Sequence, residues 1–329
     1  MKILVTGPDG VLGSNLVREL ISRSYEVSVL LLEGTKSSTL EGLPIEKFYG
    51  NILNPDDLDK CIAGKDVVIH AAASTSVYPA RDAFVNKVNI EGSKNVAEAC
   101  LRHNIKRLVY VGTANSFGHG TTAEKPGVEG NPYTSGKFGL DYMDSKRKAQ
   151  ELILDYVANK GLQAIIVNPT FMIGPYDSKP SSGEMIIALY QGKVPGYTSG
   201  GKNYVAVKDA ANAIANAVTM GRIGECYILG NENLSFKEAF ERMAKVIGVK
   251  APKRKLGPAI VKFYGSFNSF LAKVFKFRPS VTKELAAISC ECVYHSPEKA
   301  RKELLLKQTP LEVSVKECFD WFKENGYLK

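Results

Sequence analysis

The first thirteen residues are the feature that most constrains the fold of this chain. The apolar run Ile3–Val5 is too short for a helix and predicts a strand, and glycines follow at positions 7, 10 and 13. Apolar residues then recur at helical spacing from Leu12 to Ile21. A strand, a glycine-spaced turn and a helix present free backbone N–H groups to a dinucleotide pyrophosphate. The alternative is a purely structural turn, because glycines also serve ordinary turns.

Composition narrows the class of protein. With 329 residues and 44 % hydrophobic content, the chain suits a soluble enzyme with one large domain, or a nucleotide domain with a smaller one appended. No apolar run reaches the ~20 residues of a membrane-spanning helix, and the first strand begins too near Met1 for a signal peptide. The six cysteines are scattered without metal-ligand spacing. We therefore expect reduced thiols, no metal and a cytoplasmic location.

The formal net charge of +9 comes mainly from one segment. Between Lys250 and Lys283 there are nine lysines or arginines and no acidic residue. No motif that reads nucleic acid accompanies them, so we expect no nucleic-acid partner. For the aromatic and basic stretch 258–278 we expect a helix that packs its aromatic face into the protein and exposes its lysines. The alternative is contact with an anionic membrane surface.

Strand-like and helix-like segments alternate through the first half of the chain. This pattern predicts a doubly wound α/β fold (Rossmann), a parallel sheet whose ligand lies beyond the C-terminal ends of the strands. The alternation stops after Pro169. We expect a dinucleotide-binding domain over 1–169 and a smaller, mostly helical substrate lobe over 170–329, from which some elements can return to the sheet. Expected strands are 3–5, 25–32, 45–49, 66–70, 106–112 and 162–168; expected later helices are 56–61, 84–102, 146–159, 184–191, 209–220, 235–247, 258–275, 281–288 and 311–324.

Two Tyr-x-x-x-Lys pairs are candidates for acid–base chemistry. A tyrosine has a pKa of about 10 and needs a nearby cation to act near neutral pH, and residues i and i+4 share one helix face. Tyr133 and Lys137 lie among glycines that make a poor helix. Tyr142 and Lys146 open a segment that continues as a good helix, so we favour this second pair.

Over nearly its whole length the chain resembles the extended short-chain dehydrogenase/reductases, of the NAD-dependent epimerase/dehydratase superfamily. The motifs that carry the resemblance are Thr6–Gly13 for T-G-x-x-G-x-x-G, His70–Ala73 for H-x-A-A, Val88–Gly92 for V-N-x-x-G, Tyr142–Lys146 for Y-x-x-S-K, and Asn168–Pro175 for the loop that faces the nicotinamide. The nearest likeness is to dihydroflavonol-4-reductase-like proteins and hopanoid-associated sugar epimerases, through residues 193–197 and 221–230.

The resemblance implies a role for each site residue. Tyr142 is the proton donor or acceptor, Lys146 holds the nicotinamide ribose and lowers the Tyr142 pKa, and Thr113 orients the substrate oxygen, with Ser116 as the alternative. The implied cofactor-binding residues are Gly7, Asp9, Gly10, Val11, Leu12, Gly13, Glu33, Lys36, Asn51, Ile52, Ala71, Ala72, Ala73, Tyr142, Lys146, Pro169 and Met172. The candidate substrate residues are Ser74, Thr75, Tyr78, Asn115, Phe171, Tyr176 and Tyr197.

Two positions depart from the pattern of this family. After the second strand, many NAD-binding members carry an acid and many NADP-binding members an arginine, but this chain has Leu31 and Leu32, then Glu33 and Lys36. Glu33 could accept from the ribose 2′-OH and Lys36 could meet a 2′-phosphate; we lean towards NADP over NAD. Asn51 replaces an Asp near the adenine amine, and its carbonyl can still accept from that amine.

The implied function is an NAD(P)-dependent oxidoreductase that transfers a hydride between nicotinamide and a carbonyl or alcohol. An apolar wall around Phe171, Tyr176 and Tyr197 suits a small, partly apolar substrate, and the stretch 200–209 has no arginine to clamp a sugar diphosphate. A nucleotide-sugar epimerase or dehydratase is the alternative, and a non-catalytic dinucleotide sensor is the second. We expect a monomer or a homodimer, and we expect His70 to be packed beside the cofactor.

Overall fold

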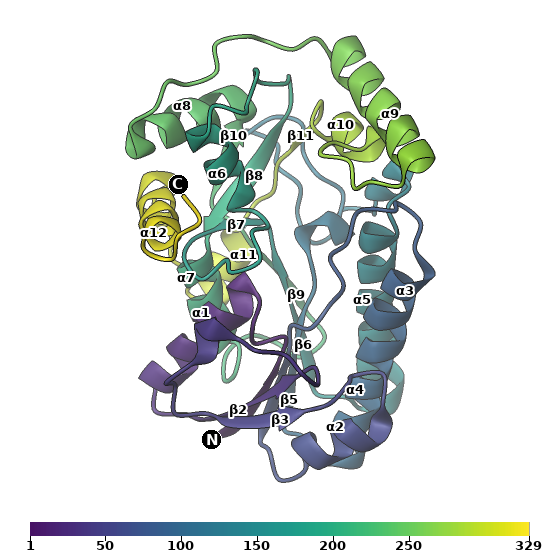
Figure 1. Ribbon diagram of the computed structural model, residues 1–329. Helices are drawn as coiled ribbons and strands as arrows, with labels where there is room; N and C mark the ends of the chain where they lie inside the picture. The colour runs from purple at the N-terminus through teal and green to yellow at the C-terminus, as the bar shows by residue number, and fades with distance from the viewer. Residues whose placement is uncertain (329) are drawn as a thin grey trace.

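A parallel sheet of seven strands organises the computed structural model, which describes residues 1–328 (Figure 1). The strand order is β3-β2-β1-β4-β5-β6-β9, with every neighbouring pair parallel. The order reverses between β1 and β4, which is where ligands bind in sheets of this kind. The strands are β1 (Lys2–Thr6), β2 (Glu26–Leu31), β3 (Glu46–Tyr49), β4 (Val67–His70), β5 (Arg107–Val111), β6 (Ala164–Pro169) and β9 (Cys226–Leu229).

Helices cover both faces of this sheet. On one face lie α1 (Val11–Ser22) and α7 (Val207–Asn216), and on the other α2 (Pro55–Ile62), α4 (Gly92–Arg102) and α5 (Asp141–Lys160). Side chains alternate along β1 accordingly: Ile3 and Val5 join the first core, and Leu4 joins the second. The expected doubly wound α/β fold is confirmed.

Two helices near the site differ from their expected bounds. The expected helix 84–102 is α3 (Ala83–Asn86), a π-helical turn (Lys87–Glu91) and α4 in succession. Helix α5 begins at Asp141 and not at residue 146, because Asp141 and Asp144 in its first turn complement the positive end of the helix dipole. Tyr142 therefore lies in the first turn of α5. Short 3-10 turns are found at Ser38–Leu40, Ala114–Ser116 and Ser135–Phe138.

A second, smaller sheet lies in the C-terminal half of the chain. Its central strand β8 (Gly201–Ala206) pairs with β10 (Glu232–Ser235) on one side and with β7 (Phe171–Ile173) and β11 (Cys292–Val293) on the other. Helices α6 (Glu184–Tyr190), α8 (Phe236–Ile247) and α12 (Leu311–Glu324) enclose its core. The helices are close to those expected, whereas the strands are not expected from the sequence because they are short and contain polar residues such as Lys202 and Asn233.

The two sheets are joined by very short connections. Thr170 alone separates β6 from β7, α7 begins immediately after β8, and only Gly230 and Asn231 separate β9 from β10. Helix α7, strand β9 and α11 (Glu298–Glu303), all from the second half of the chain, pack with the first sheet. A division into domains at residue 169 stays a prediction.

Helix α9 (Pro258–Phe275) corrects one expectation. It lies with α10 (Lys283–Ile288) at the rim of the molecule (Figure 1). Its buried residues are Gly265 and Ala272, while its large aromatic side chains are exposed. The expectation that the aromatic face is packed is therefore wrong, because small residues occupy the packed face. Within residues 1–328 no helix is both long enough and apolar enough to cross a membrane.

Candidate active site

The glycine turn between β1 and α1 has space in front of only one of its glycines. Gly7 has φ +68°, and a Cβ on it would lie 2.7 Å from the Ala72 Cα; a Cβ on Gly13 would overlap the Gly7 carbonyl oxygen. Gly10, the N-cap of α1, has φ −77°, and its nearest neighbour would be 3.9 Å away. The fold therefore requires Gly7 and Gly13, whereas at Gly10 it leaves open space beside the free N–H groups of α1. This cradle fits a pyrophosphate, with Val11 and Leu12 in the turn behind it.

Hydrogen bonds join this turn to the end of β4. The Thr6 Oγ1 lies 2.7 Å from the His70 Nδ1 and accepts from the Ala72 N–H at 3.2 Å. These bonds hold the Ala71–Ala73 strand extension against Gly7. His70 is buried as expected, and burial, together with the charge of Lys146, lowers its pKa to about 3. His70 is therefore a neutral positioning residue near pH 7.

An open pocket of about 340 Å³ lies just after the ends of β2 and β3. Leu32, Glu33, Gly50, Asn51 and Asp57 line it. The Asp57 Oδ2 accepts from the Asn51 N–H at 3.0 Å, and the Asn51 Oδ1 accepts from the Leu53 N–H at 2.9 Å.

This cavity refines the expectations for the adenosine end. Glu33 lines it, whereas Lys36 is exposed and is not among its lining residues. Ile52 is buried beside Asn51. Sequence reasoning missed Asp57; the available signal is the Asn54-Pro55 start of α2, which places Asp57 in the first helical turn, facing the Gly50 backbone.

The candidate catalytic residues lie on α5 and after β5. The Lys146 Nζ is buried, donates to the Val111 carbonyl oxygen at 2.7 Å and lies 4.7 Å from the Tyr110 ring centroid. Burial lowers the Lys146 pKa to about 8, and the charge of Tyr142 opposes that shift. Tyr142 itself is half-buried, one turn earlier on α5. Lys146 is thus fixed at the end of β5 with Tyr142 on the same helix face.

Thr113 lies two residues after the end of β5. It is buried, its Oγ1 accepts from the Asn115 N–H at 3.3 Å, and its carbonyl oxygen accepts from the Asn168 Nδ2 at 3.1 Å. Asn168 is held in turn by the Gln150 Oε1 at 2.7 Å. The alternative, Ser116, is also buried, and its hydroxyl has no partner within residues 1–328. Thr113 is therefore tied to both α5 and β6, and both hydroxyls remain candidates.

Asn89, in the π-helical turn, is a positioning residue that sequence reasoning did not single out. Its Nδ2 donates to the Ser74 carbonyl oxygen at 3.0 Å and to the Ser145 Oγ at 2.9 Å, and its Oδ1 accepts from the Ser74 N–H at 2.8 Å. It therefore fastens the loop after β4 to α5, between Tyr142 and Lys146. The V-N-x-x-G motif was its signal, and single π turns are frequent at functional sites.

The other tyrosine–lysine pair is engaged elsewhere. The Tyr133 hydroxyl donates to the Asp144 Oδ1 at 2.7 Å, and burial together with the Asp144 charge raises the Tyr133 pKa. The Lys137 Nζ bonds the Glu291 Oε2 at 2.7 Å. A raised pKa is the opposite of what a tyrosine base requires.

The candidate substrate residues come from several parts of the fold. Ser74, Thr75 and Tyr78 lie on the loop after β4, Asn115 follows Thr113, and Phe171 and Tyr197 pack on the core of the second sheet. Tyr176 instead lies 3.8 Å under the Arg18 guanidinium and against Trp321. At the end of β6, Pro169 is buried and Met172 half-buried, and Asp9 forms an ion pair with Lys179 at 3.0 Å.

Lys202 is a third residue to which sequence reasoning gave no role. Its Nζ lies 4.2 Å from the Phe171 ring centroid, and within residues 1–328 no carboxylate pairs with it. Burial lowers its pKa to about 8. In the sequence only an arginine was expected to clamp a sugar diphosphate in this stretch, so Lys202 was assigned no role.

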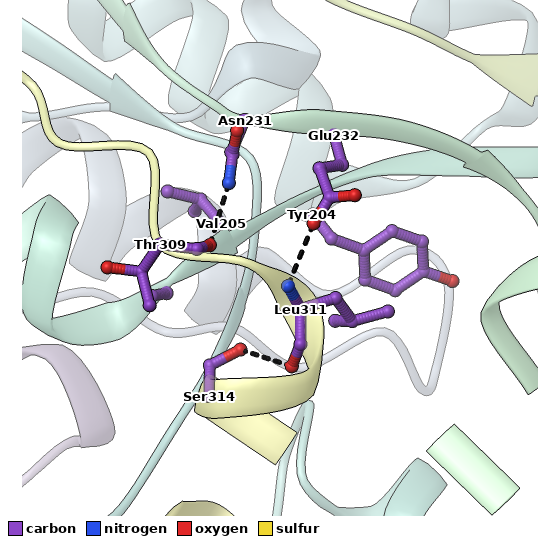
Figure 2. Close-up of a pocket in the computed structure, with 8 residues that line it drawn as sticks. Tyr204, Val205, Asn231, Glu232, Thr309, Leu311 and Ser314 are labelled. Atoms are coloured by element: carbon purple, nitrogen blue, oxygen red, sulfur yellow. Dashed lines mark hydrogen bonds between the residues drawn. The ribbon is translucent and has the colours of Figure 1, made fainter. Parts of the chain in front are cut away.

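A crevice between β8, β10 and α12 is a packing seam and not a ligand site. Figure 2 shows the Asn231 Nδ2 donating to the Thr309 carbonyl oxygen and the Leu311 N–H donating to Glu232, both at 2.8 Å. The space between these residues leaves no room for a water molecule. Asp209 on α7 accepts from the Thr309 N–H at 2.7 Å, which ties the seam to the first sheet.

Known proteins are similar to this chain over its whole length. The family described as "NAD dependent epimerase/dehydratase family" matches residues 3–230. A protein of Synechocystis sp. named "Putative dihydroflavonol 4-reductase" is 28% identical to this chain. The match covers 99% of this chain and 95% of the length of that protein. The crystal structure of gox2253 is 32% identical, covers 99% of both chains and has a TM-score of 0.87. A nucleoside-diphosphate-sugar epimerase from Pseudomonas aeruginosa is 25% identical, covers 100% of this chain and 99% of its own, and has a TM-score of 0.81.

Proposed function

This chain belongs to the NAD dependent epimerase/dehydratase family, and from that premise we propose that it is an oxidoreductase acting on a carbonyl or alcohol of a small, partly apolar substrate. The cofactor of the family is a nicotinamide dinucleotide, as the sequence predicts. Support for a reductase comes from the name of the Synechocystis relative, which matches nearly the whole chain.

The observation that carries the proposal is the buried Lys146, one helical turn after Tyr142. In this arrangement the Tyr142 hydroxyl would donate its proton to a carbonyl oxygen of the substrate, or take it back in the reverse direction, beside the Lys146 amine. Thr113, held by Asn168, orients that oxygen through its hydroxyl. Tyr133 is unsuited to this work because it already donates to Asp144.

The candidate residues suit both the nicotinamide half and the adenosine half of a dinucleotide. The cradle at Gly10 would hold the pyrophosphate, Lys146 the nicotinamide ribose, and Glu33 with Asn51 the adenosine. When bound, the nicotinamide supplies or accepts the hydride. In the proposed reaction Tyr142 would supply the proton, and Thr113 would orient the oxygen.

We propose NAD(H) as the preferred form, which reverses the preference from sequence. Glu33 lines the adenosine cavity together with Asp57, and Lys36 does not. Two carboxylates would repel a 2′-phosphate, whereas a ribose 2′-OH can donate to Glu33.

The direct experiment is a screen of purified protein with NADH and NADPH against aldehydes, ketones and UDP-sugars. Stoichiometric consumption of NADH with a free carbonyl compound, abolished in Tyr142→Phe, is the expected result. Interconversion of a UDP-sugar with no net change in NADH would replace the proposal by its alternative.

The alternative, a nucleotide-sugar epimerase, is favoured by one observation. Lys202 is a half-buried cation with no carboxylate partner in residues 1–328, and an unpaired buried cation can bind a diphosphate. Lys202→Ala would then weaken UDP binding by roughly tenfold or more, as expected for a charged hydrogen bond. A reductase of a neutral substrate would show no UDP binding to lose.

A further inference from the structure

Helix α9 exposes a continuous apolar stripe. Ile260, Phe263, Phe267, Phe270 and Val274 follow one another at intervals of three or four residues, so they lie on one face of the helix. Phe263 is 72% exposed and Phe270 62%. Tyr264, Phe275 and Phe277 are exposed beside them. The helix stands at the rim of the molecule, so this stripe faces outward (Figure 1).

The opposite face of α9 is fixed against α10. A Cβ on Gly265 would lie 2.5 Å from the Ala286 Cβ, which shows how closely the two helices approach. The Ser269 Oγ accepts from the Lys283 N–H at 2.9 Å, and the Asn268 Nδ2 donates to the Val281 carbonyl oxygen at 3.3 Å. Rotation of α9 to bury its aromatic residues would break these contacts. The outward direction of the stripe is therefore part of the fold.

The surroundings of the stripe are strongly basic. All nine lysines and arginines from Lys250 to Lys283 are exposed, and the segment contains no acidic residue. Five of them lie on α9, between α9 and α10, or at the first residue of α10: Lys262, Lys273, Lys276, Arg278 and Lys283. Among the residues that the structure describes, only Lys283 of these nine pairs with a carboxylate, Glu284, at 3.7 Å. An exposed aromatic face bordered by unpaired cations is the pattern of helices that lie in the interface of an anionic bilayer.

We propose that α9 docks this protein on the surface of an anionic phospholipid membrane. The apolar stripe enters the boundary between headgroups and acyl chains, and the surrounding lysines and arginines bind the phosphates. A second copy of this chain is a poorer occupant, because it would bring the basic residues on and beside its own α9 against those of the first copy. The proposal concerns location and is independent of the reaction at Tyr142.

Flotation with lipid vesicles tests the proposal on the full-length protein. Vesicles of phosphatidylcholine alone are compared with vesicles containing roughly one third phosphatidylglycerol. We expect binding only to the anionic vesicles, and weaker binding at high salt. Replacing Lys273, Lys276 and Arg278 by alanine is expected to lower the partition coefficient by roughly fivefold for each charge removed.

A matched pair of variants isolates the aromatic contribution. Phe263→Ser removes an exposed phenylalanine from the stripe, and Phe84→Ser removes one that is 61% exposed on α3. The first is expected to weaken vesicle binding by roughly tenfold or more, and the second to leave it unchanged. Dinucleotide binding in both variants verifies that they are folded.

Three results would overturn the proposal. They are the absence of binding to anionic vesicles at low salt, equal binding by Phe263→Ser and Phe84→Ser, and concentration-dependent dimers that depend on Phe263 while lipid binding does not. The last result would assign the stripe to a second copy of the chain. The protein could also bind vesicles through Phe263 and yet reduce no carbonyl compound. That result would support the docking surface and contradict only the proposed reaction.

Discussion

The two ends of the proposed cofactor site differ in how their residues are held. At the nicotinamide end, Lys146, Thr113 and Asn89 are buried and joined to α5, β5 and β6 by hydrogen bonds. At the adenosine end, Glu33 and Lys36 are exposed on the loop after β2. The first arrangement fixes each atom from several directions, whereas the second leaves the choice of partner to side chains in solvent. The proposed proton chemistry therefore depends on residues that the fold fixes, and the proposed cofactor preference on a loop.

The largest effect is expected at the fixed end, from Tyr142→Phe. The change removes the phenolic hydroxyl that carries the transferable proton, and turnover should fall by about 10²–10⁴-fold, the range for loss of a general acid. Dinucleotide affinity, measured by the quenching of tryptophan fluorescence, should stay within a few-fold. Full turnover in this variant would show that Tyr142 is the wrong tyrosine.

Between the two ends, Gly10→Val tests the pyrophosphate cradle. A φ of −77° is accessible to valine and the space in front of Gly10 is open, so the variant should fold with an unchanged Tm. A side chain in the path of the pyrophosphate should weaken binding by roughly 100-fold, the equivalent of a clash of ~3 kcal/mol. Gly13→Val serves as the contrast and should lower Tm, because its Cβ would overlap the Gly7 carbonyl oxygen. Unchanged affinity in a folded Gly10→Val variant would remove the cradle from the binding site.

At the adenosine end, Glu33→Ala and Lys36→Ala test the choice between the two cofactors. Loss of a hydrogen bond to the Glu33 carboxylate should weaken NADH by roughly tenfold and leave NADPH nearly unchanged. Lys36→Ala should change neither dissociation constant by more than a few-fold. A selective loss of NADPH affinity in Lys36→Ala would restore the preference for NADP that the sequence favours.

A smaller effect is expected when Lys146 loses its proton. Its pKa is lowered to about 8, so the amine is charged below this pH and neutral above it. Raising the pH through 8 should therefore weaken dinucleotide binding, by roughly fivefold for a charged hydrogen bond that becomes neutral. Lys146→Met should bind more weakly at every pH and show no such transition. A wild-type affinity that is flat from pH 7 to 9.5 would contradict this role.

The smallest effect is expected from Tyr133→Phe. The lost hydrogen bond to Asp144 should lower the free energy of unfolding by about 1 kcal/mol and leave turnover close to wild type. Urea denaturation and steady-state kinetics on one preparation measure both quantities. A large loss of turnover with unchanged stability would exchange the roles of the two tyrosines.

Local sequence predicted most of the first sheet because most of its strands are nearly continuous apolar runs between turn residues; β3 is half polar, and β9 was not among the expected strands. The glycine turn and the Tyr142/Lys146 spacing were equally visible, since both are short-range patterns. The role of Asn89 was not visible, because it depends on a π turn and on the distant Ser74 and Ser145. The strands of the second sheet were missed because polar residues interrupt them.

Helix α9 is the segment whose packed face was predicted wrongly. Its bounds were predicted correctly from the pattern, but the pattern does not say which face is packed. The close approach of α10 selects Gly265 and Ala272 for the buried side, and this contact is tertiary. The lining of the adenosine cavity by Asp57 is likewise a contact between a helix and a neighbouring loop, which spacing along the chain does not reveal.

The short connections between the two sheets restrict how this protein can admit and release its ligands. A hinge requires residues that absorb large backbone rotations, and joints of one residue, no residue and two residues offer almost none. The second sheet is therefore expected to keep its orientation relative to the first sheet and not to move as a closing domain. We then expect ligands to enter and leave through movement of surface loops such as 74–82. The rate of product release would depend on how fast those loops move and not on domain closure.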